Sequence, residues 1–268
     1  MLGQDRLRLT AVVLAILGCG AGSYAADAFG LRVAGVVRVL ASADEMPEVF
    51  SFAARTPKPG FERELVEAFA RARGLEMRIV PVKNFDQIIP LLVKGEGDLI
   101  VGIVDTAARR QKIAFTSETY PVRHLVVTRK PQAAVSSPAD FRSLKVAAIP
   151  GTTWADAATE AGVPAANIVS CVDTNDALDA LKKGRAQATV MAVFDFALAQ
   201  KYDPALEAGP FLGVPGVAAW GVRKEDQALL RAIDDYLLTL RMSPAKSTLL
   251  VKYFSADALE LLRRARKE

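Results

Sequence analysis

The sequence predicts an α/β fold made of two similar halves, each built on a parallel sheet, joined by a two-strand hinge. Apolar runs of strand length alternate with amphipathic helical segments, which is the pattern of a parallel sheet covered by helices on both faces. This alternation occurs twice, and a late strand at 217–222 returns after the second half is complete. A chain that enters the second half and comes back implies a discontinuous first domain.

In the first half, turn glycines and helix starts mark the ends of the elements. Gly60 opens a helix with apolar residues at helical spacing and Gly74 ends it, while Asp86 opens the next helix and Gly95 ends that one. Each helix lies between two apolar runs of strand length. The expected strands of this half are 36–41, 75–80 and 98–104.

The second half repeats this order, with Thr153 at the start of one helix and Thr174 as the cap of the next. The expected helices span 153–161, 174–183, 227–240 and 255–266. The expected strands are 125–128, 144–149, 168–172, 188–193 and 217–222. The two halves should join near 126–131 and near 215–220.

The first 25 residues predict a secretory signal peptide. Arg6 and Arg8 form a short positive head, residues 9–18 are apolar but too short to span a bilayer, and Ala25 ends a stretch suited to cleavage. We therefore expect a periplasmic protein after signal-peptide cleavage. A competing interpretation is a lipobox in which Cys19 carries a lipid anchor.

Composition gives little support to nucleic-acid binding or to a metal centre. The net charge is only +4, the basic residues are scattered outside the C-terminal tail, and aromatic residues make up 7% of the chain. The single histidine, His124, and the one cysteine left after cleavage, Cys171, are too few for a zinc site or an internal disulfide. We expect no cofactor, and we assign His124 a structural role.

Arg109 is the main candidate for a ligand contact. It lies in a short helix that Thr106 can cap, just after the apolar strand 98–104. A guanidinium and a helix N-terminus aimed at one point suit an anion, most often a carboxylate. The alternative is a surface residue paired with Glu118.

Further polar residues follow the ends of other predicted strands. Asp44 follows the first strand, and Thr152 and Thr153 open a helix after the strand 144–149. In open α/β sheets, ligands bind beyond the carboxyl ends of the strands, so these residues should converge with Arg109. The two threonines are also good helix caps whatever the function.

At this point the chain resembles the extracellular solute-binding proteins of ABC importers, in the polar amino-acid-binding family. The resemblance covers nearly the whole mature chain. It rests on the order and spacing of five segments, which are Gly60-Phe61-Glu62, Gly95-Glu96-Gly97-Asp98-Leu99-Ile100, Thr106 to Thr116, Gly151-Thr152-Thr153 and Val222-Arg223-Lys224-Glu225-Asp226.

The resemblance implies a type II periplasmic binding protein fold, in which two Rossmann-like parallel-sheet lobes are joined by a two-strand hinge and close on a ligand. Lobe 1 would comprise residues 26–127 and 218–268, and lobe 2 residues 128–217. In that family the arginine matching Arg109 pairs with the ligand carboxylate. The residue matching Thr153 donates from the opposite lobe, and an aromatic residue, for which we favour Phe50 over Phe52, covers the ligand.

One expected feature of that family is missing. The aspartate that usually holds the α-ammonium group corresponds to Ala192. Because an unpaired buried ion costs roughly 3–5 kcal/mol, a standard α-amino acid in the usual pose should bind poorly. Asp105 or Asp195 could supply a displaced carboxylate, and a ligand without an ammonium group is the alternative.

We therefore expect an exported, monomeric binding protein, not an enzyme, that captures a small carboxylate-bearing solute. The solute would be amino-acid-like or a related organic acid, delivered to the permease of an ABC importer. One alternative is a cleft enzyme of the cyclohexadienyl dehydratase type, with His124, Glu45 or Asp105 as the acid–base group. Another is a sensory or partner-binding domain without a transport role.

Overall fold

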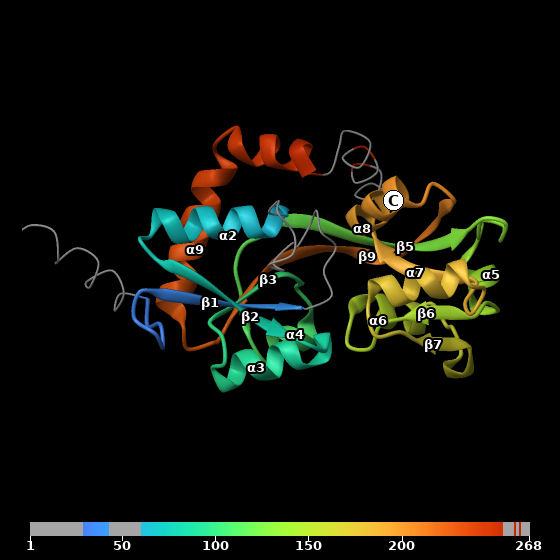
Figure 1. Ribbon diagram of the computed structural model, residues 1–268, viewed down its shortest axis with the longest axis horizontal. Coiled ribbons are helices and arrows are strands. Elements are labelled where there is room, and N and C mark those ends of the chain that lie inside the picture. The colour runs from blue at the N-terminus through green and yellow to red at the C-terminus, as the bar shows by residue number, and fades with distance from the viewer. Residues whose placement is uncertain (1–28, 43–59, 254–259, 261–262, 264–268) are drawn as a thin grey trace, which may run out of the picture.

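The computed structural model describes residues 29–42, 60–253, 260 and 263. Within them, two α/β lobes lie side by side along the long axis of the molecule (Figure 1). The strands are β1 (Val36–Ser42), β2 (Glu76–Val82), β3 (Leu99–Val104), β4 (Ala114–Phe115), β5 (Tyr120–Arg129), β6 (Val146–Ala148), β7 (Ile168–Ser170), β8 (Ala188–Ala192) and β9 (Leu206–Val222). They form one continuous sheet in the order β2-β1-β3-β9-β5-β8-β6-β7, with β4 also paired to β9.

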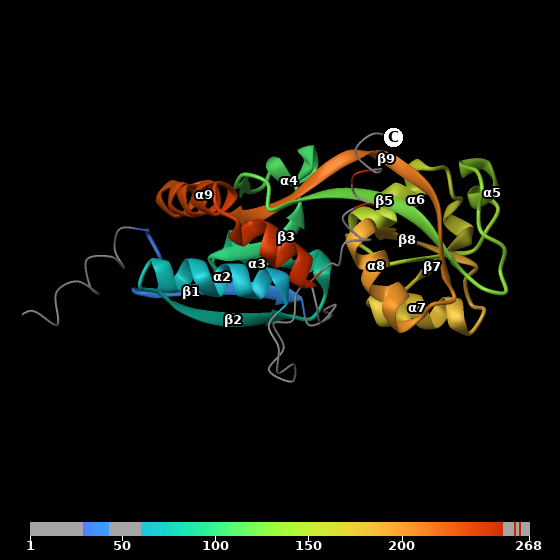
Figure 2. The same cartoon turned by 90° about the horizontal axis from the view of Figure 1, so that it is seen from above.

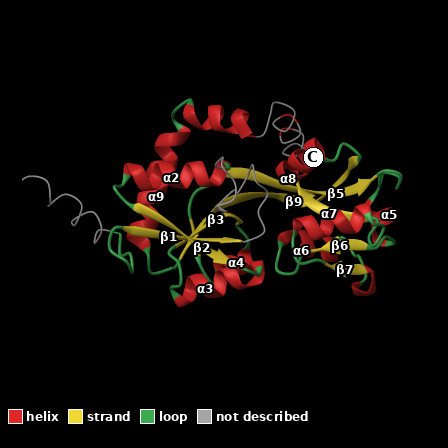
Figure 3. Ribbon diagram, in the orientation of Figure 1, coloured by secondary structure: helices red, strands yellow, loops and turns green. Residues whose placement is uncertain are grey.

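Lobe 1 is built around β1, which pairs in parallel with β2 on one side and with β3 on the other. The C-terminal part of β9 adds to this sheet in the antiparallel sense beside β3. Helices and strands alternate as the periodicity predicts, and the helices flank the strands (Figure 3). The helices of this lobe are α2 (Phe61–Ala72), α3 (Ile88–Lys94), which follows the short 3-10 turn Phe85–Gln87, α4 (Ala107–Arg110) and α9 (Gln227–Arg241).

Lobe 2 repeats the arrangement around β6, which pairs in parallel with β7 and β8. One apolar cluster of this lobe places Ala157 and Ala158 against Val126 and Val190 of the sheet. The helices of this lobe are α5 (Pro138–Arg142), α6 (Thr153–Glu160), α7 (Thr174–Lys182) and α8 (Val193–Tyr202), with a 3-10 turn at Ala165–Asn167.

The lobes are joined by β5 and β9, which run antiparallel from one lobe to the other (Figure 2). Tyr120 pairs with Ala218 at the lobe 1 end, and Thr128 pairs with Glu207 at the lobe 2 end. The ladder shifts register near its middle, where β9 carries the exposed residues 213–215 and Gly213 has a φ of +59°. Glycine suits that left-handed backbone because it has no Cβ. The prediction of a two-strand hinge is confirmed.

Most predicted elements are present, but several bounds differ. Asp173 caps α7 by accepting a hydrogen bond from the Asp176 amide at 2.7 Å, so the prediction that Thr174 is the cap was wrong. The strand β9 begins well before the predicted strand 217–222. The helix α8 was not predicted. The predicted helix 255–266 falls almost wholly outside the described residues.

Two of the sequence segments that carry the family resemblance meet inside lobe 1. Asp98 is fully buried, and its carboxylate accepts hydrogen bonds from Arg38 Nε at 2.9 Å and from Arg223 Nη2 at 3.2 Å. Arg223 also pairs with Asp226 at 2.6 Å. This buried ionic network fixes the loop before β3 against the end of β9.

A second buried carboxyl, Glu62, lies at the start of α2. The Trp220 indole donates to Glu62 Oε2 at 2.7 Å, and the Thr119 hydroxyl lies 3.4 Å from Oε1. Burial is the main cause that raises the pKa of Glu62 to about 7, which the two donors only partly oppose. The carboxyl is therefore held largely in its neutral form up to neutral pH.

Replacing Glu62 by glutamine should make stability less dependent on pH. The folded protein binds the Glu62 proton more tightly than the unfolded chain, so this group's stabilisation is complete below about pH 4.5 and is lost as the pH rises through 7. The loss amounts to about 3 kcal/mol, since each pKa unit corresponds to about 1.4 kcal/mol. Thermal unfolding of both proteins from acid to mildly alkaline pH checks this, and an unchanged decline in Glu62→Gln would contradict it.

Candidate functional site

Arg109 occupies the position that the sequence predicted, in α4 directly after β3. The Thr106 hydroxyl caps this helix by accepting a hydrogen bond from the Arg109 amide at 3.2 Å. The strand-to-helix turn therefore fixes the backbone of Arg109. The position of its side chain follows from contacts made on both lobes.

The Arg109 guanidinium is buried and bonds to backbone carbonyls. Nη1 donates to Val104 O at 2.8 Å, Nη2 donates to Gly151 O at 3.2 Å, and Cζ lies 5.6 Å from the centre of the Phe85 ring. No ion pair of the described residues includes Arg109. Burial lowers the pKa of Arg109, and the exposed Asp156 opposes this effect. Arg109 is thus a buried cation whose bonding partners are all neutral.

The contact with Gly151 brings the two lobes together. Gly151 has a φ of +78°, and a Cβ placed there would lie 2.9 Å from Asp86 Cβ and 3.0 Å from Asp86 Cα. These distances are too short for any side chain, so glycine is required where the loop before α6 meets lobe 1. The lobes are in contact beside Arg109.

Thr152 and Thr153 have different environments. Thr152 caps α6, accepting from the Ala155 amide at 3.3 Å and donating to Ile149 O at 2.7 Å, so its hydroxyl is used within lobe 2. Thr153 is buried, and its Oγ1 lies 2.9 Å from Nε2 of His124. Thr153 therefore faces the strand β5, on the lobe 2 side of the hinge.

Asp105 forms an ion pair with Arg110 of α4. Its carboxylate oxygen Oδ1 accepts a hydrogen bond from Arg110 Nε at 2.6 Å, and Oδ2 pairs with Arg110 Nη2. The Arg110 side chain is 65% exposed and the Asp105 side chain is 5% exposed. The pair neutralises the acidic group closest in sequence to Arg109, so Asp105 adds little net negative charge to the site.

Asp44, Phe50 and Glu45 lie outside the described residues. Asp195 lies in the first turn of α8, and burial raises its pKa to about 7. It lies close enough to Tyr120 to raise the pKa of that phenol. The neighbouring Phe194 ring packs edge-on against Tyr120 with the ring centres 5.5 Å apart, so this turn of α8 lies against the lobe 1 end of β5.

His124 forms part of the site that sequence reasoning missed. His124 pairs with Ala192 across β5 and β8, which places the imidazole beside the position of the missing aspartate. Burial, followed by repulsion from Arg123 and from Arg109, lowers the pKa of His124 to about 4. Arg123, the preceding residue of the strand, lies over the Phe211 ring with its Cζ 5.7 Å from the ring centre, whereas His124 contacts Thr153 of α6. We call Arg109, Thr153 and His124 the Arg109 cluster.

The sequence did contain one signal for this cluster. Two basic residues stand next to each other, Arg123 and His124, inside the otherwise apolar strand β5. Burying a charged side chain in the interior of a strand costs free energy unless a counter-charge or a hydrogen-bond partner lies beside it. That signal could have drawn attention to His124, which the sequence analysis treated as structural.

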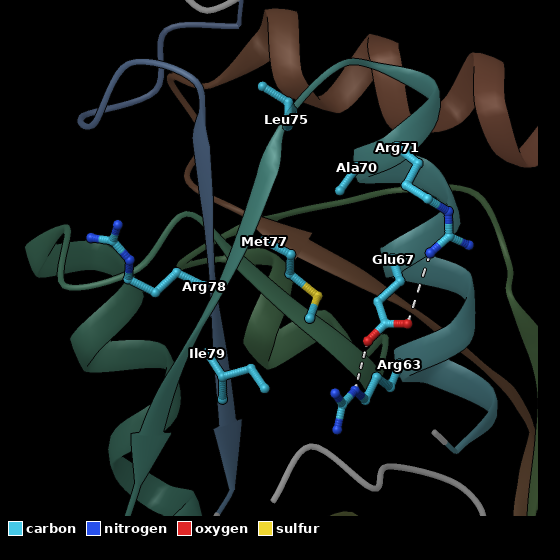
Figure 4. A pocket seen from close by; sticks show the side chains of 8 residues that line it. All are labelled: Arg63, Glu67, Ala70, Arg71, Leu75, Met77, Arg78 and Ile79. Carbon is cyan, nitrogen blue, oxygen red and sulfur yellow. Dashed lines mark hydrogen bonds and ion pairs between the residues drawn. The ribbon is translucent and has the colours of Figure 1, made fainter. Parts of the chain in front are cut away.

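A separate hollow lies on lobe 1, between α2 and β2 (Figure 4). Its volume is about 440 Å³. Among its polar groups, Glu67 lies 2.7 Å from Arg63 and 3.9 Å from Arg71. The hollow is lined by Arg63, Glu67, Ala70, Arg71, Leu75, Met77, Arg78 and Ile79. None of the predicted ligand contacts lines it, so it is distinct from the Arg109 cluster.

The described residues meet neither the side-chain requirement of a metal site nor the helix requirement of a membrane span. No cluster of three or more acidic, histidine or cysteine side chains that could hold a metal ion occurs there. No helix in that part of the chain has both the length and the apolar character needed to cross a bilayer.

Comparison with known proteins supports a ligand-binding fold. Holo ArgBP from T. maritima superposes with a TM-score of 0.70 at 29% identity, over 82% of this chain and 96% of that one. The ancestral amino acid-binding protein AncCDT-1, a precursor of cyclohexadienyl dehydratase, gives a TM-score of 0.73 at 28% identity, over 82% and 96%. These similarities match the two-lobed architecture.

Among curated sequences, membrane-bound lytic murein transglycosylase F from Pseudomonas syringae pv. tomato is 29% identical over 210 residues. The match covers 76% of this chain and 42% of the relative, so the chain spans less than half the length of that relative. The model of the bacterial extracellular solute-binding proteins, family 3, matches residues 37–256. The chain belongs to this family of bacterial extracellular solute-binding proteins.

Proposed function

We propose that the protein captures a small carboxylate-bearing solute between its lobes and delivers it for ABC-type import. The observation that carries this proposal is Arg109, a buried guanidinium held at the contact between the lobes, whose hydrogen-bond acceptors within the described residues are two backbone carbonyl oxygens. A carboxylate is the ligand group that best satisfies such a cation, because a charged acceptor forms stronger hydrogen bonds than a neutral one.

Binding by lobe closure accounts for the positions of the flanking groups. Arg109 comes from lobe 1, and Thr153 and Gly151 come from lobe 2, so a ligand held by Arg109 would be enclosed when the lobes meet. We assign residues 26–127 and 218–268 to lobe 1 and residues 128–217 to lobe 2, with Phe50 and Asp44 completing the site. The protein would act in the periplasm as a monomer that docks on a permease.

Replacing Arg109 by glutamine should weaken carboxylate binding by about ten- to a hundredfold. A hydrogen bond to a charged group contributes about 1.5–3 kcal/mol, which sets that range. The matched control is Arg110→Gln, on the same short helix, because the Arg110 side chain is exposed and pairs with Asp105. Ligands would first be found by thermal shift against amino acids, keto acids, dicarboxylates, opines and peptidoglycan fragments, then titrated calorimetrically. Equal affinity in Arg109→Gln and wild type would contradict the proposal.

A second candidate is a sensing role in which the ligand comes from the cell wall. The observation in its favour is the similarity to lytic murein transglycosylase F, in which the matched region is less than half of the relative. Murein fragments carry peptide carboxylates, so the same Arg109 site would serve. Tight binding of peptidoglycan peptides, with free amino acids and organic acids inactive, would favour sensing over import.

A further inference from the structure

Two hydrogen bonds connect lobe 1 and the hinge strand β5 to the start of α6. Arg109 Nη2 donates to Gly151 O at 3.2 Å, and Thr153, two residues further along the chain, is the first residue of α6. Two residues of chain span at most about 7 Å. Thr153 Oγ1 lies 2.9 Å from Nε2 of His124. The Thr153 side chain is therefore bonded to His124 and lies near Arg109 through the loop at Gly151.

The packing of β5 explains why His124 meets Thr153. Successive side chains of a strand point to opposite faces, and the ladder between β5 and β8 is regular over 124–128, so His124 shares its face with Val126. Val126 belongs to the same buried apolar cluster as Ala157 and Ala158 of α6. His124 is closer to lobe 1 and contacts the first turn of that helix. The bond to Thr153 is thus part of the packing of α6 on the hinge strand.

The imidazole of His124 is neutral at neutral pH. Burial, followed by repulsion from Arg123 and from Arg109, lowers the pKa of His124 to about 4. A neutral imidazole has one nitrogen that donates a hydrogen bond and one that only accepts. The bond to Thr153 therefore has two possible forms. In one, Nε2 donates to the hydroxyl, and in the other the hydroxyl donates to Nε2.

The two forms differ in what Thr153 offers to a ligand. A threonine hydroxyl has one proton and two lone pairs, whereas a carboxylate only accepts hydrogen bonds. A hydroxyl that donates to His124 has no proton left for a carboxylate on Arg109 and can only turn its lone pairs towards it. When Nε2 donates instead, the hydroxyl proton is free for the carboxylate.

We propose that His124 is a positioning residue that donates from Nε2 to Thr153, so that the Thr153 hydroxyl donates to a ligand carboxylate bound by Arg109. This inference rests on the proposed function of the site between the lobes and assigns a role in that site to a residue of the hinge. The Arg109 cluster then supplies two donors from opposite lobes, the Arg109 guanidinium and the Thr153 hydroxyl, to one anionic group.

The position of the His124 proton can be measured directly. His124 is the only histidine in the chain, so untagged protein made with nitrogen-labelled histidine gives one imidazole, whose two nitrogens NMR distinguishes. At neutral pH we expect a proton on Nε2 and none on Nδ1. The probes are acetate, pyruvate and L-alanine, which share a carboxylate, and at least one should shift the Nε2 resonance without moving the proton. A proton on Nδ1, or no response to any probe, would overturn the inference.

Substitutions of His124 separate hydrogen-bond donation from side-chain volume. His124→Gln keeps a donor at about the position of Nε2 and should retain most of the affinity for the best-binding probe. His124→Leu has no donor and should weaken binding about three- to tenfold, the usual range for the loss of one hydrogen bond. Thr128→Val is the matched control and should bind normally. Thr128 is a buried polar residue of the same strand, and its Oγ1 has no hydrogen-bond partner among the described residues.

A double-variant cycle tests whether His124 acts through Thr153. Thr153→Val removes the hydroxyl and should weaken probe binding by a factor similar to that of His124→Leu. Added to Thr153→Val, His124→Leu should cause no further loss, because the donor that it positions is already absent. Losses that multiply would indicate a purely structural role and overturn the inference. If His124→Leu does not fold, the proton position in the wild type still decides.

The inference and the proposed function fail in different ways. Probe binding that depends on Arg109 but is equal in His124→Leu and wild type would show that the inference is wrong and would leave the proposed function intact. Only ligand binding that ignores Arg109→Gln would overturn the proposed function itself.

Discussion

Replacing Asp98 by alanine should lower the free energy of unfolding by about 3–5 kcal/mol, because it leaves buried cations without their partner. Asp98 is fully buried, with Arg38 Nη2 at 2.8 Å from Oδ1 and Arg223 Nη2 at 3.2 Å from the same oxygen. The Arg223 side chain is itself only 3% exposed, so water cannot readily replace the lost carboxylate. A loss of this size is comparable to a large part of the stability of an ordinary domain.

The measurement is chemical denaturation of wild type and Asp98→Ala, followed by circular dichroism. Glu96→Ala is the matched control, since Glu96 lies in the same loop and is exposed. Asp98→Asn should fall between them, because the amide oxygen keeps a hydrogen-bond acceptor but not the charge. A destabilisation by Asp98→Ala no larger than that of the control would show that the network is not needed for stability.

Replacing Gly151 by alanine should weaken ligand binding by tenfold or more, through a clash that exists only when the lobes meet. The added Cβ would come within 3.0 Å of the Asp86 backbone, and overpacking of this kind costs about 1–3 kcal/mol. The clash acts on the closed state, so the penalty should appear in ligand affinity. Titration of the variant with any ligand identified by the thermal-shift screen measures it.

Gly184→Ala separates this clash from backbone strain. Gly184 also lies in lobe 2 with a positive φ, +70°, but its Cβ would meet nothing within 4 Å. Both variants should lose stability from the left-handed backbone, which costs about 1–2 kcal/mol, and only Gly151→Ala should also lose affinity. Equal affinities in the two variants would contradict a role for Gly151 in closure.

Much of the fold follows from local signals in the sequence. The strands of lobe 1 are apolar runs between helices that end at or just before Gly74 and Gly95, so their periodicity and turn residues predict them. The helix α8 was missed because apolar residues surround it, including the buried Phe194 and Phe196, so no helical face stands out. The strand β9 was predicted too short because Gly209, Pro210 and Gly213 read as turn residues, whereas in the structure they lie within a bent ladder.

Only the local part of the candidate site could be predicted from the sequence, and the reason differs from the one that limits the prediction of the fold. Arg109 and its cap Thr106 are close in sequence, so their joint geometry follows from a local strand-to-helix turn. The part formed by His124 depends on the register of β5 against β8 and on the approach of the lobes. These relations join residues far apart in the chain, and no local pattern specifies them.

The position of β9 has a consequence for how the chain folds. This strand is the last in the sequence, yet Gly221 pairs with Ile100 in lobe 1 and Leu206 pairs with Arg129 in lobe 2. The continuous sheet cannot be completed in either lobe until this late segment has been made and has crossed back. Contacts of such long sequence separation require a large loop-closure entropy before they give any stability. Refolding should therefore be slow, and a nascent chain that ends before β9 would expose the edges of both β3 and β5 to aggregation.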